Sequence, residues 1–473
     1  MKVLLLNPPT RDDKKFIREG RCTQEQGVWA TLWPPISLAT IGAVLEEDGH
    51  MVKIVDCAAQ GVKWAELERL IDNFSPQVVI WSTGTPSIKS DLELASFVKG
   101  CDVKVFTAVF GTHVTVLDKQ CMDKFPEIDF IVRNEPELTI SESIKSLQRN
   151  GDVKDVAGVT FRNDAGEIIA NPKRPFIDDL DNLPLPAWHL INLDCYRLPL
   201  KGKQYLMISP LRGCPFNCSF CTCQTYYGKR LRKRSVKSVL KEIEYDIERF
   251  EVRDFFFWAE TFVVDKEYIR QLCSAIVEKG ISISWTSNSR VDTVDAPLLK
   301  LMAKAGCWMI SYGVESGSQR ILDEVDKGIK VEQAYKAVAW SKEAGIKTVG
   351  HFILGLPGET EESMKQTINY SKSLGLDLAQ FYCAVPFPGS RLYERALNEG
   401  WIEGSDFGHY NQDSALMELP TVSSKVVDSY RTLAYRKFYF NLSRGFRTLK
   451  LVNWKDVRKL FSSARDFLGW LHK

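Results

Sequence analysis

Cys214-Pro-Phe-Asn-Cys218-Ser-Phe-Cys221 places three cysteines in a C-x3-C-x2-C spacing. Four thiolates normally complete a [4Fe–4S] cluster, so three can hold three corners of a cubane and leave one iron open to another ligand. The alternative is a structural zinc site, with Cys223 as the fourth ligand. The chain has no second C-x2-C pair to complete such a site, and His189 lies well upstream. The spacing therefore predicts an iron–sulfur cluster with an open position.

This motif resembles the signature of the radical S-adenosylmethionine (SAM) enzymes, with Phe220 before the third cysteine and Arg212-Gly213 ahead of the first. The resemblance implies that Cys214, Cys218 and Cys221 bind the cluster and that SAM closes the open position. It further implies that one electron from the reduced cluster cleaves SAM to a 5′-deoxyadenosyl radical, while the protein supplies orientation and shielding. A reductant such as ferredoxin or flavodoxin is then an expected partner.

The composition is that of a globular protein of two or three domains. The chain has 473 residues, of which 44% are hydrophobic and 26% are charged. The net charge of +2 does not favour a nucleic-acid partner for the whole molecule. The opening MKVLLLNPP is too short in its apolar run for a secretory leader, and no run approaches the length of a transmembrane helix. Twelve cysteines without a leader indicate a reducing compartment, so we expect a cytoplasmic protein.

The first part of the chain alternates apolar runs with helical patterns. The runs lie at 3–6, 52–55, 78–81, 103–110 and 130–132. This alternation predicts an α/β domain over residues 1–150, a Rossmann-like, doubly wound parallel sheet. Ligands bind such sheets at the carboxyl ends of the strands. The loops at these ends contain no G-x-G-x-x-G, so a dinucleotide is not the expected ligand.

This part resembles the cobalamin (vitamin B12)-binding domain that precedes the radical SAM domain in one large subgroup. The resemblance rests on Asn7-Pro8-Pro9, Pro34-Pro35, Gly49-His50 ahead of a strand ending at Asp56, and Asn134-Glu135-Pro136-Glu137. It implies a cobalamin ligand, and the candidate contacts at the strand ends are Asn7, Pro8, Thr83, Gly84, Gly111, Thr112 and Glu135. A fold alone does not establish a ligand, so the alternative is the same sheet without cobalamin.

One departure from the methyl-cobalamin pattern D-x-H-x-x-G bears on the chemistry. Asp48-Gly49-His50 is followed by Lys53 where that pattern has glycine. Cobalamin would then be bound without a protein histidine on cobalt, and His50 would belong to a helix-to-strand turn. Trp29 and Trp33 are candidates to cover a corrin face, although aromatic residues more often pack in a core.

The second half of the chain predicts a barrel. Residues 151–200 contain a hairpin pattern and four prolines, at 172, 175, 184 and 186, and are expected to form a linker. Strand patterns follow at 205–208, 255–258, 281–285, 309–313, 348–354 and 378–383, separated by helical patterns. We expect a partial (β/α)6 radical SAM barrel over residues 201–400, with the active site at the carboxyl ends of the strands. Residues 401–473 are expected to be a helical C-terminal region.

Polar residues follow several of the expected strands. Glu260 stands where the radical SAM family commonly has an acidic residue for the SAM amino group, although Ala259 departs from the commoner acidic pair. Asn288 and Arg290 after the third strand are suited to carboxylate or ribose oxygens, and Glu315 after the fourth to a ribose. Each motif alone also fits a structural turn or a helix cap. Their order after the cysteines predicts a SAM site.

The basic run at 229–234 invites a nucleic-acid interpretation. We expect a solvated loop that leads into a helix instead, because charge runs are commonly surface faces. An RNA methylthiotransferase is the corresponding rival function, but its N-terminal domain carries its own cluster cysteines. Here Cys22, Cys57, Cys101 and Cys121 are dispersed and stand mostly on expected strands or helix starts, where free cysteines usually pack as small buried hydrophobic residues.

The last segment, 454–471, has an apolar stripe with basic residues elsewhere. We expect it to pack against the barrel; the alternative is peripheral contact with a membrane or a lipid-like substrate. Taken together, the sequence predicts a cobalamin-dependent radical SAM enzyme that methylates an unactivated carbon of a small or lipid-like substrate. A cyclase, oxidase or carbon–carbon coupling enzyme without methyl transfer is the alternative. A noncatalytic cluster or cobalamin sensor would leave Glu260, Arg290 and Glu315 without a purpose.

Overall fold

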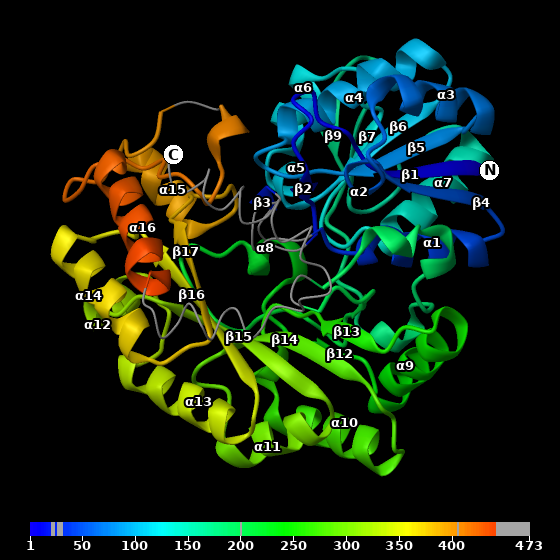
Figure 1. Cartoon of the computed structure of the whole chain (residues 1–473). Helices are drawn as coiled ribbons and strands as arrows, with labels where there is room; N and C mark the ends of the chain where they lie inside the picture. Colours follow the sequence, from blue (N-terminus) through cyan, green and yellow to red (C-terminus); the bar gives the residue numbers. More distant parts are fainter. Residues whose placement is uncertain (20–23, 26–31, 199–200, 404–405, 441–473) are drawn as a thin grey trace.

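Two α/β units form the molecule, and the short helix α8 (Cys223–Tyr227) lies between them (Figure 1). The computed structural model describes residues 1–19, 24–25, 32–198, 201–403 and 406–440. Trp29 and the expected helix at 454–471 lie outside these residues. Within them, no helix has the length and apolar character needed to cross a membrane.

The first unit is a seven-stranded sheet in the order β4-β1-β5-β6-β7-β8-β9. The expected parallel strands are present as β1 (Lys2–Asn7), β4 (Met51–Asp56), β5 (Val78–Ser82), β6 (Phe106–Phe110) and β7 (Phe130–Val132). The hairpin β8 (Val159–Arg162) and β9 (Ile168–Ala170) adds two antiparallel strands next to β7. Every residue of β5 is buried, because helices cover both faces of such a sheet.

The helices of this unit pack in two groups. Helix α1 (Ile36–Glu47) packs with α7 (Glu137–Asn150), and α3 (Trp64–Phe74) packs with α4 (Ile88–Cys101). The strand order reverses between β1 and β5, which is where doubly wound sheets open a crevice for ligands.

The second unit confirms the predicted partial barrel. Its six parallel strands follow one another in chain order: β10 (Leu206–Ile208), β13 (Asp254–Phe257), β14 (Ser284–Arg290), β15 (Cys307–Glu315), β16 (Lys347–Leu354) and β17 (Leu378–Cys383). The helices α9 (Val236–Phe250), α10 (Lys266–Glu278), α11 (Ala296–Lys304), α13 (Val331–Glu343) and α14 (Glu361–Ser373) run along its outer side (Figure 1). A small ribbon of β11 (Leu211–Arg212) and β12 (Arg232–Lys233) flanks the cysteine loop.

The prediction for the third barrel strand was wrong at both ends. The pattern placed it at 281–285, whereas β14 runs from Ser284 to Arg290. Its second half carries Asn288 and Arg290, whose side chains face a cavity instead of a packed core, so hydrophobic periodicity does not mark them. Glu315 is likewise the last residue of β15 and not part of the loop after it.

Helix α16 (Ser424–Tyr439) protects the open edge of the barrel, since β17 has a strand neighbour on one side only. The Tyr435 hydroxyl accepts a hydrogen bond from the Phe381 amide (3.1 Å), and Arg431 Nε donates to the Phe381 carbonyl (3.0 Å). The Tyr439 hydroxyl bonds both the amide (3.0 Å) and the carbonyl (2.7 Å) of Ala379. Side chains thus satisfy backbone groups that a further strand would otherwise pair.

Buried ion pairs join the two units. Arg212 of β11 donates to Glu135 (3.2 Å) and to Glu137 (2.6 Å), which stand between β7 and α7 and at the start of α7. Arg232 of β12 donates to both carboxylate oxygens of Glu135, each at 2.8 Å. All four residues are buried. Asn134, next to them, donates to the Thr225 carbonyl of α8 (2.7 Å).

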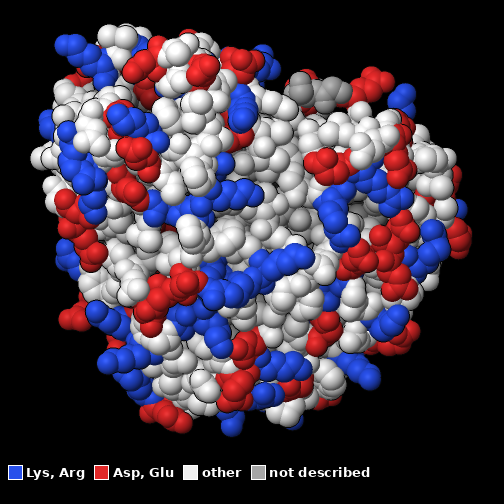
Figure 2. All heavy atoms as spheres, turned by 180° about the vertical axis from the view of Figure 1, so that it is seen from behind, with Lys and Arg blue, Asp and Glu red and all other residues white. Residues whose placement is uncertain are grey.

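The expectation of a solvated loop at 229–234 was therefore wrong for two of its arginines. Arg232 is buried against Glu135, and Arg234 is buried in an ion pair with Glu242 of α9. Arg230, in contrast, is 69% exposed in its side chain. The strand β12 alternates its side chains, so neighbouring charges face opposite environments. On the face shown in Figure 2, basic and acidic side chains are intermixed.

Replacing Arg232 with methionine tests the contribution of this junction to stability. Arg232→Met removes a buried partner of Glu135, so we expect the free energy of unfolding to fall by about 3–5 kcal/mol. The measurement is urea unfolding of the purified protein. The matched control is Arg230→Met, which removes an exposed ion pair with Asp178 and should cost about 1 kcal/mol or less. Equal effects of the two substitutions would contradict the assignment.

Candidate active site

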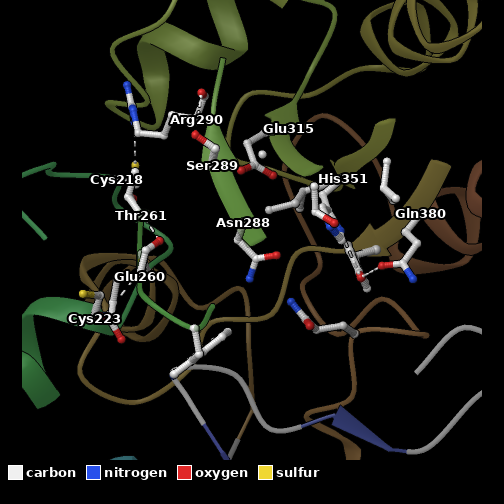
Figure 3. Close-up of a pocket in the computed structure, with 18 of the residues that line it drawn as sticks. Cys218, Cys223, Glu260, Thr261, Asn288, Ser289, Arg290, Glu315, His351 and Gln380 are labelled. Carbon is white, nitrogen blue, oxygen red and sulfur yellow. Dashed lines mark hydrogen bonds between the residues drawn. The ribbon is translucent and has the colours of Figure 1, made fainter. Parts of the chain in front are cut away.

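A cavity of about 350 Å³ lies at the carboxyl ends of the barrel strands (Figure 3). It contains all the barrel residues that the sequence predicted for a site: Cys214, Cys218, Cys221, Glu260, Asn288, Arg290 and Glu315. Two residues from the first unit, Ile17 and Trp33, line it as well. Trp33 packs against Phe256 (ring centroids 5.3 Å apart) and Trp258 (4.9 Å). The cavity is therefore shared by both units.

Backbone contacts set the course of the cysteine loop. Gly213 has φ +90°, and a Cβ on it would collide with the carbonyl oxygen of Arg230. Only glycine permits this close approach at such a backbone angle. The Cys214 amide bonds the Gly228 carbonyl (3.2 Å), and the Ser219 amide bonds the Val325 carbonyl (2.9 Å). These bonds tie the loop to Gly228, which follows α8, and to Val325 of the barrel unit.

Arg290 stands over this loop. Its Nε and Nη2 donate to the two carboxylate oxygens of Asp292, at 2.9 and 2.8 Å. Its guanidinium lies 3.6 Å from the ring centroid of Phe216, between the first two cysteines. The remaining nitrogen, Nη1, lies 3.8 Å from Cys218 Sγ, as Figure 3 shows. Arg290 therefore places a fixed positive charge beside this sulfur.

The other sulfurs also have polar neighbours. Cys214 Sγ lies 3.8 Å from Thr261 Oγ1, and Cys221 Sγ accepts a hydrogen bond from the Cys223 amide (3.5 Å). The hydrogen bond to Cys214, burial and the nearby Glu260 raise the pKa of Cys223. Among the described residues, no three His, Cys, Asp or Glu side chains are placed to hold a single metal ion. A [4Fe–4S] cluster makes a different demand, because its cysteines bind separate irons.

Glu260 and Asn288 reach into the cavity from neighbouring strands. Glu260 follows β13 and is 4% exposed. Asn288 projects from the middle of β14, and its side chain makes no hydrogen bond to any residue that the structure describes (Figure 3). An amide in that position is available to a ligand.

Glu315 is paired with a lysine that the sequence did not single out. Lys327 Nζ lies 2.6 Å from Glu315 Oε1, and both side chains are buried. Glu315 has φ +64°, an unfavourable angle for a residue with a side chain. The pair fills the space over Gly313, where a Cβ would lie 2.6 Å from Glu315 Oε1 and 3.0 Å from Lys327 Nζ. No sequence motif indicated Lys327, which stands in a turn after α12 (Gln319–Glu324).

Sequence reasoning also missed His351 and Gln380, which lie close to Tyr382. All three line the cavity from β16 and β17. His351 Nδ1 lies 3.2 Å from the Tyr382 hydroxyl, which also bonds Gln380 Oε1. A polar residue at an alternate position of an otherwise apolar strand was the available signal.

In the first unit, four of the predicted cobalamin contacts gather in a small hollow at the ends of β5 and β6. They are Thr83, Gly84, Gly111 and Thr112. Gly111 has φ +140°, and a Cβ there would lie 2.6 Å from Thr83 Oγ1. Arg18 lines the hollow too; it is paired with Asp91 (2.6 Å), and its Nη1 is buried without a hydrogen-bond partner. The hollow is therefore lined by a residue with an unused hydrogen-bond donor.

The other three predicted contacts are not in this hollow. Asn7 Nδ2 donates to Asp56 (3.1 Å), which also accepts from Tyr196 (2.8 Å), and Ser82 bonds the Asn7 side-chain oxygen. Pro8 is buried beside it. The carboxylate of Glu135 is taken by the arginine junction and by the Ile177 amide (2.8 Å). The structure thus gives Asn7 and Glu135 internal partners.

Two family models match the chain. The model of the radical SAM superfamily matches residues 208–371, and the model of the B12 binding domain matches residues 27–143. The first match covers most of the barrel and the second covers most of the parallel sheet of the first unit. Each model thus coincides with one of the two units.

Curated relatives resemble the chain over most of its length. An uncharacterized methyltransferase of Pyrococcus horikoshii is 32% identical over 93% of this chain and 92% of the relative. Cytidylyl-2-hydroxyethylphosphonate methyltransferase of Streptomyces wedmorensis is 28% identical over 85% of this chain and 83% of the relative. Anaerobic magnesium-protoporphyrin IX monomethyl ester cyclase of Rubrivivax gelatinosus is 28% identical over 92% of this chain and 79% of the relative.

Two solved structures share the fold. The radical SAM methyltransferase TsrM from Kitasatospora setae, with cobalamin and a [4Fe–4S] cluster bound, has a TM-score of 0.68 at 16% identity and covers 84% of this chain and 74% of its own. The cobalamin-dependent SAM radical enzyme OxsB, with aqua-cobalamin and SAM bound, has a TM-score of 0.72 at 17% identity. The match covers 99% of this chain and 71% of OxsB. The two-unit arrangement is therefore common to these proteins.

A pH dependence of stability follows from Glu19, in the segment that brings Ile17 and Trp33 to the cavity. Its carboxylate accepts from the amide (3.1 Å) and hydroxyl (2.8 Å) of Ser37, and burial raises its pKa to about 7. Because the folded-state pKa lies above the unfolded value, this group stabilises the fold at low pH, and the contribution is lost as the pH rises toward 7 and above.

Glu19→Gln has no group that ionises at this position. We therefore expect its free energy of unfolding, relative to that of the wild type, to increase by up to ~3 kcal/mol as the pH rises from 5 to 8. Urea unfolding at a series of pH values measures this difference. Glu47→Gln, at an exposed position of α1, is the control and should keep the wild-type profile. Parallel pH profiles for wild type and Glu19→Gln would contradict the assignment.

Proposed function

The chain belongs to the radical SAM superfamily, in the group that carries an N-terminal B12-binding domain, and we propose that it transfers a methyl group to an unactivated carbon of its substrate. It is a cobalamin-dependent radical SAM enzyme, and the cofactors of this group are a [4Fe–4S] cluster, SAM and cobalamin. The observation that carries the proposal is the shared cavity, which Ile17 and Trp33 of the first unit line together with the three cysteines. Both cofactor-binding units thus have access to one substrate.

The residues present fit these cofactors. Cys214, Cys218 and Cys221 are three soft sulfur donors on one loop, and they would hold three irons of the cluster. Glu260 and Asn288 would meet the polar groups of SAM from the adjacent strands. When bound, the cluster and SAM supply a 5′-deoxyadenosyl radical and methylcobalamin supplies the methyl group.

The protein's own part is orientation and exclusion of water. Asp292 and Phe216 hold Arg290 against Cys218, so this cation stays beside the sulfur in one orientation. Trp258 and Trp308 wall the cavity with apolar surface, which keeps water from a reactive substrate carbon. We place the enzyme in the cytoplasm, with a reductant such as ferredoxin or flavodoxin as electron donor. No disulfide joins the cysteines of the described chain.

The hollow of the first unit fits part of cobalamin. The unused Arg18 nitrogen suits an amide or phosphate oxygen, groups that the corrin carries at its periphery and on its nucleotide tail. Gly111 lets its backbone lie close against Thr83 in this hollow, since a Cβ there would lie 2.6 Å from Thr83 Oγ1. We assign Thr83, Gly84, Gly111 and Thr112 to cobalamin binding, together with Arg18.

A second candidate is ring formation without methyl transfer. The similarity to anaerobic magnesium-protoporphyrin IX monomethyl ester cyclase favours it, since that relative is 28% identical over 92% of this chain. The same fold supports both outcomes, and the fate of SAM distinguishes them.

The test is mass spectrometry of SAM products from the anaerobically reconstituted protein, with reductant, cobalamin and a cell extract as the substrate source. Methyl transfer yields both 5′-deoxyadenosine and S-adenosylhomocysteine, and we expect both to vanish in Cys218→Ala. The neighbouring cysteine gives a matched control, because Cys223→Ala should keep the cluster absorbance and both products. Deoxyadenosine alone would favour cyclisation. The absence of both products and of any cluster would overturn the enzyme assignment.

Cobalamin binding has its own test in Gly111→Ala. The added methyl group would clash with Thr83 and force a shift of the residues that line the hollow, so we expect at least a tenfold loss of affinity for hydroxocobalamin, read from its absorbance in equilibrium dialysis. Gly151→Ala is the control, because Gly151 also has a positive φ (+78°) but no atom within 4 Å of the added carbon. Unchanged affinity in Gly111→Ala would remove the hollow from the cobalamin site.

A further inference from the structure

Helix α8 follows the cysteine loop and brings a tyrosine to the hollow of the first unit (Figure 1). Tyr226 lines this hollow together with Arg18, and it is buried. Its hydroxyl makes no hydrogen bond to any residue that the structure describes. Burial raises the pKa of Tyr226 well above its usual value, so the hydroxyl keeps its proton. Because buried hydroxyls normally have a hydrogen-bond partner, this one is available to a ligand in the hollow.

The first unit and the arginine junction hold the backbone of α8 on both sides of Tyr226. Asn134 donates to the Thr225 carbonyl (2.7 Å), and Arg232 Nη2 donates to the Tyr227 carbonyl (2.7 Å). The rings of Tyr226 and Tyr227 meet edge to face, with centroids 4.8 Å apart. The place of Tyr226 at the hollow is therefore set by contacts to both of its neighbours in the chain.

The other contacts of α8 go to the cysteine loop. The helix begins two residues after Cys221, the last cysteine of the motif. Gln224 Nε2 donates to the Phe216 carbonyl (2.6 Å), which lies between the first two cysteines. The Gly228 carbonyl, directly after α8, accepts from the Cys214 amide (3.2 Å). A shift of α8 would therefore disturb the cysteine loop at both of its ends.

Two ligands that need α8 in the same position are coupled through it. A ligand bound to Tyr226 in the hollow restrains α8, and a cluster on the cysteine loop restrains the same helix from its other contacts. The second ligand then meets a site that is already ordered and loses less conformational entropy on binding. Such coupling is reciprocal, because each ligand changes the affinity of the other by the same factor.

We propose that Tyr226 binds a polar group of cobalamin, and that α8 couples this contact to the cysteine loop so that cobalamin and the cluster strengthen each other's binding. The inference rests on the proposed function, because it extends the cobalamin site that we assign to the hollow. The Tyr226 hydroxyl would donate to an amide or phosphate oxygen of the cofactor. The cofactor of the first unit would thus be bound in part by a residue that follows the cluster motif.

Tyr226→Phe tests the contact itself. The measurement is anaerobic equilibrium dialysis of hydroxocobalamin against the full chain with its cluster reconstituted. We expect the affinity to fall about fivefold, the effect of one lost hydrogen bond. Tyr227→Phe is the matched control, because it removes the other tyrosine hydroxyl of α8 from a residue that does not line the hollow. This control should keep the wild-type affinity.

The same dialysis on the cluster-free full chain tests the coupling. We expect the wild type to bind hydroxocobalamin at least about fivefold more weakly without its cluster, a factor at the lower end of measured couplings between sites. In Tyr226→Phe this ratio of affinities should fall toward one, whereas Tyr227→Phe should keep the wild-type ratio. A tyrosine with a merely structural role would lower the affinity of both forms alike and leave the ratio unchanged.

The outcomes separate this inference from the proposed function. Unchanged affinity or an unchanged ratio in Tyr226→Phe, equal losses in the two tyrosine variants, or equal affinities of the two wild-type forms would overturn the inference. The hollow would still stand as the cobalamin site if Gly111→Ala weakened binding, and methyl transfer would stand if the wild-type enzyme formed both SAM products. Conversely, a weaker affinity and a smaller ratio in Tyr226→Phe alone would support the inference even if only deoxyadenosine were formed.

Discussion

The buried ion pairs of Glu135 and Glu137 with Arg212 and Arg232 are the constraint on which the rest of the molecule depends. Arg212 stands two positions before Cys214, so the anchor of the cysteine loop is held by carboxylates of the other unit. Buried charges are costly unless they are paired, so these ion pairs favour the relative position of the two units in which they form. That position brings Trp33 to the same cavity as the cysteines. The shared cavity is therefore a consequence of the junction.

Much of the fold could be predicted from the sequence because its strands are buried on both faces. Strands such as β1 and β5 are continuous apolar runs, and the spacing between them leaves room for helices. The prediction failed at β14, where inward positions carry Thr286, Asn288 and Arg290. Those positions face a cavity, and a strand that lines a cavity has no apolar pattern to detect.

The residues of the site also fall into two groups, those that the sequence could predict and those that it could not. The three cysteines, Glu260 and Arg290 could be found because they belong to short local motifs. The motif around Glu135 predicted a cobalamin contact, but the partners of this residue lie far along the chain, and no local pattern shows that Arg212 and Arg232 occupy its carboxylate. The prediction of a solvated loop at 229–234 failed for the same reason. Contacts with residues elsewhere in the fold decide which arginines are buried, and local charge does not show these contacts. His351 and Lys327 likewise become part of the site only because the fold brings their strand and turn to the cavity.

The division of charge within the cavity suggests how this architecture can serve different substrates. Charged side chains are concentrated on the side of the cavity beside the cysteine loop, where each cation has its own carboxylate, and SAM itself is a cation with a carboxylate. The β16–β17 side has the polar side chains of His351, Gln380 and Tyr382, with the apolar Val349 and Leu378 in the same wall. Substitutions at Val349, His351, Leu378 or Gln380 would reshape that side without contact with the cysteine loop. Because the junction fixes the cysteine loop through residues outside these strands, the β16–β17 side is free to vary while the radical chemistry stays in place.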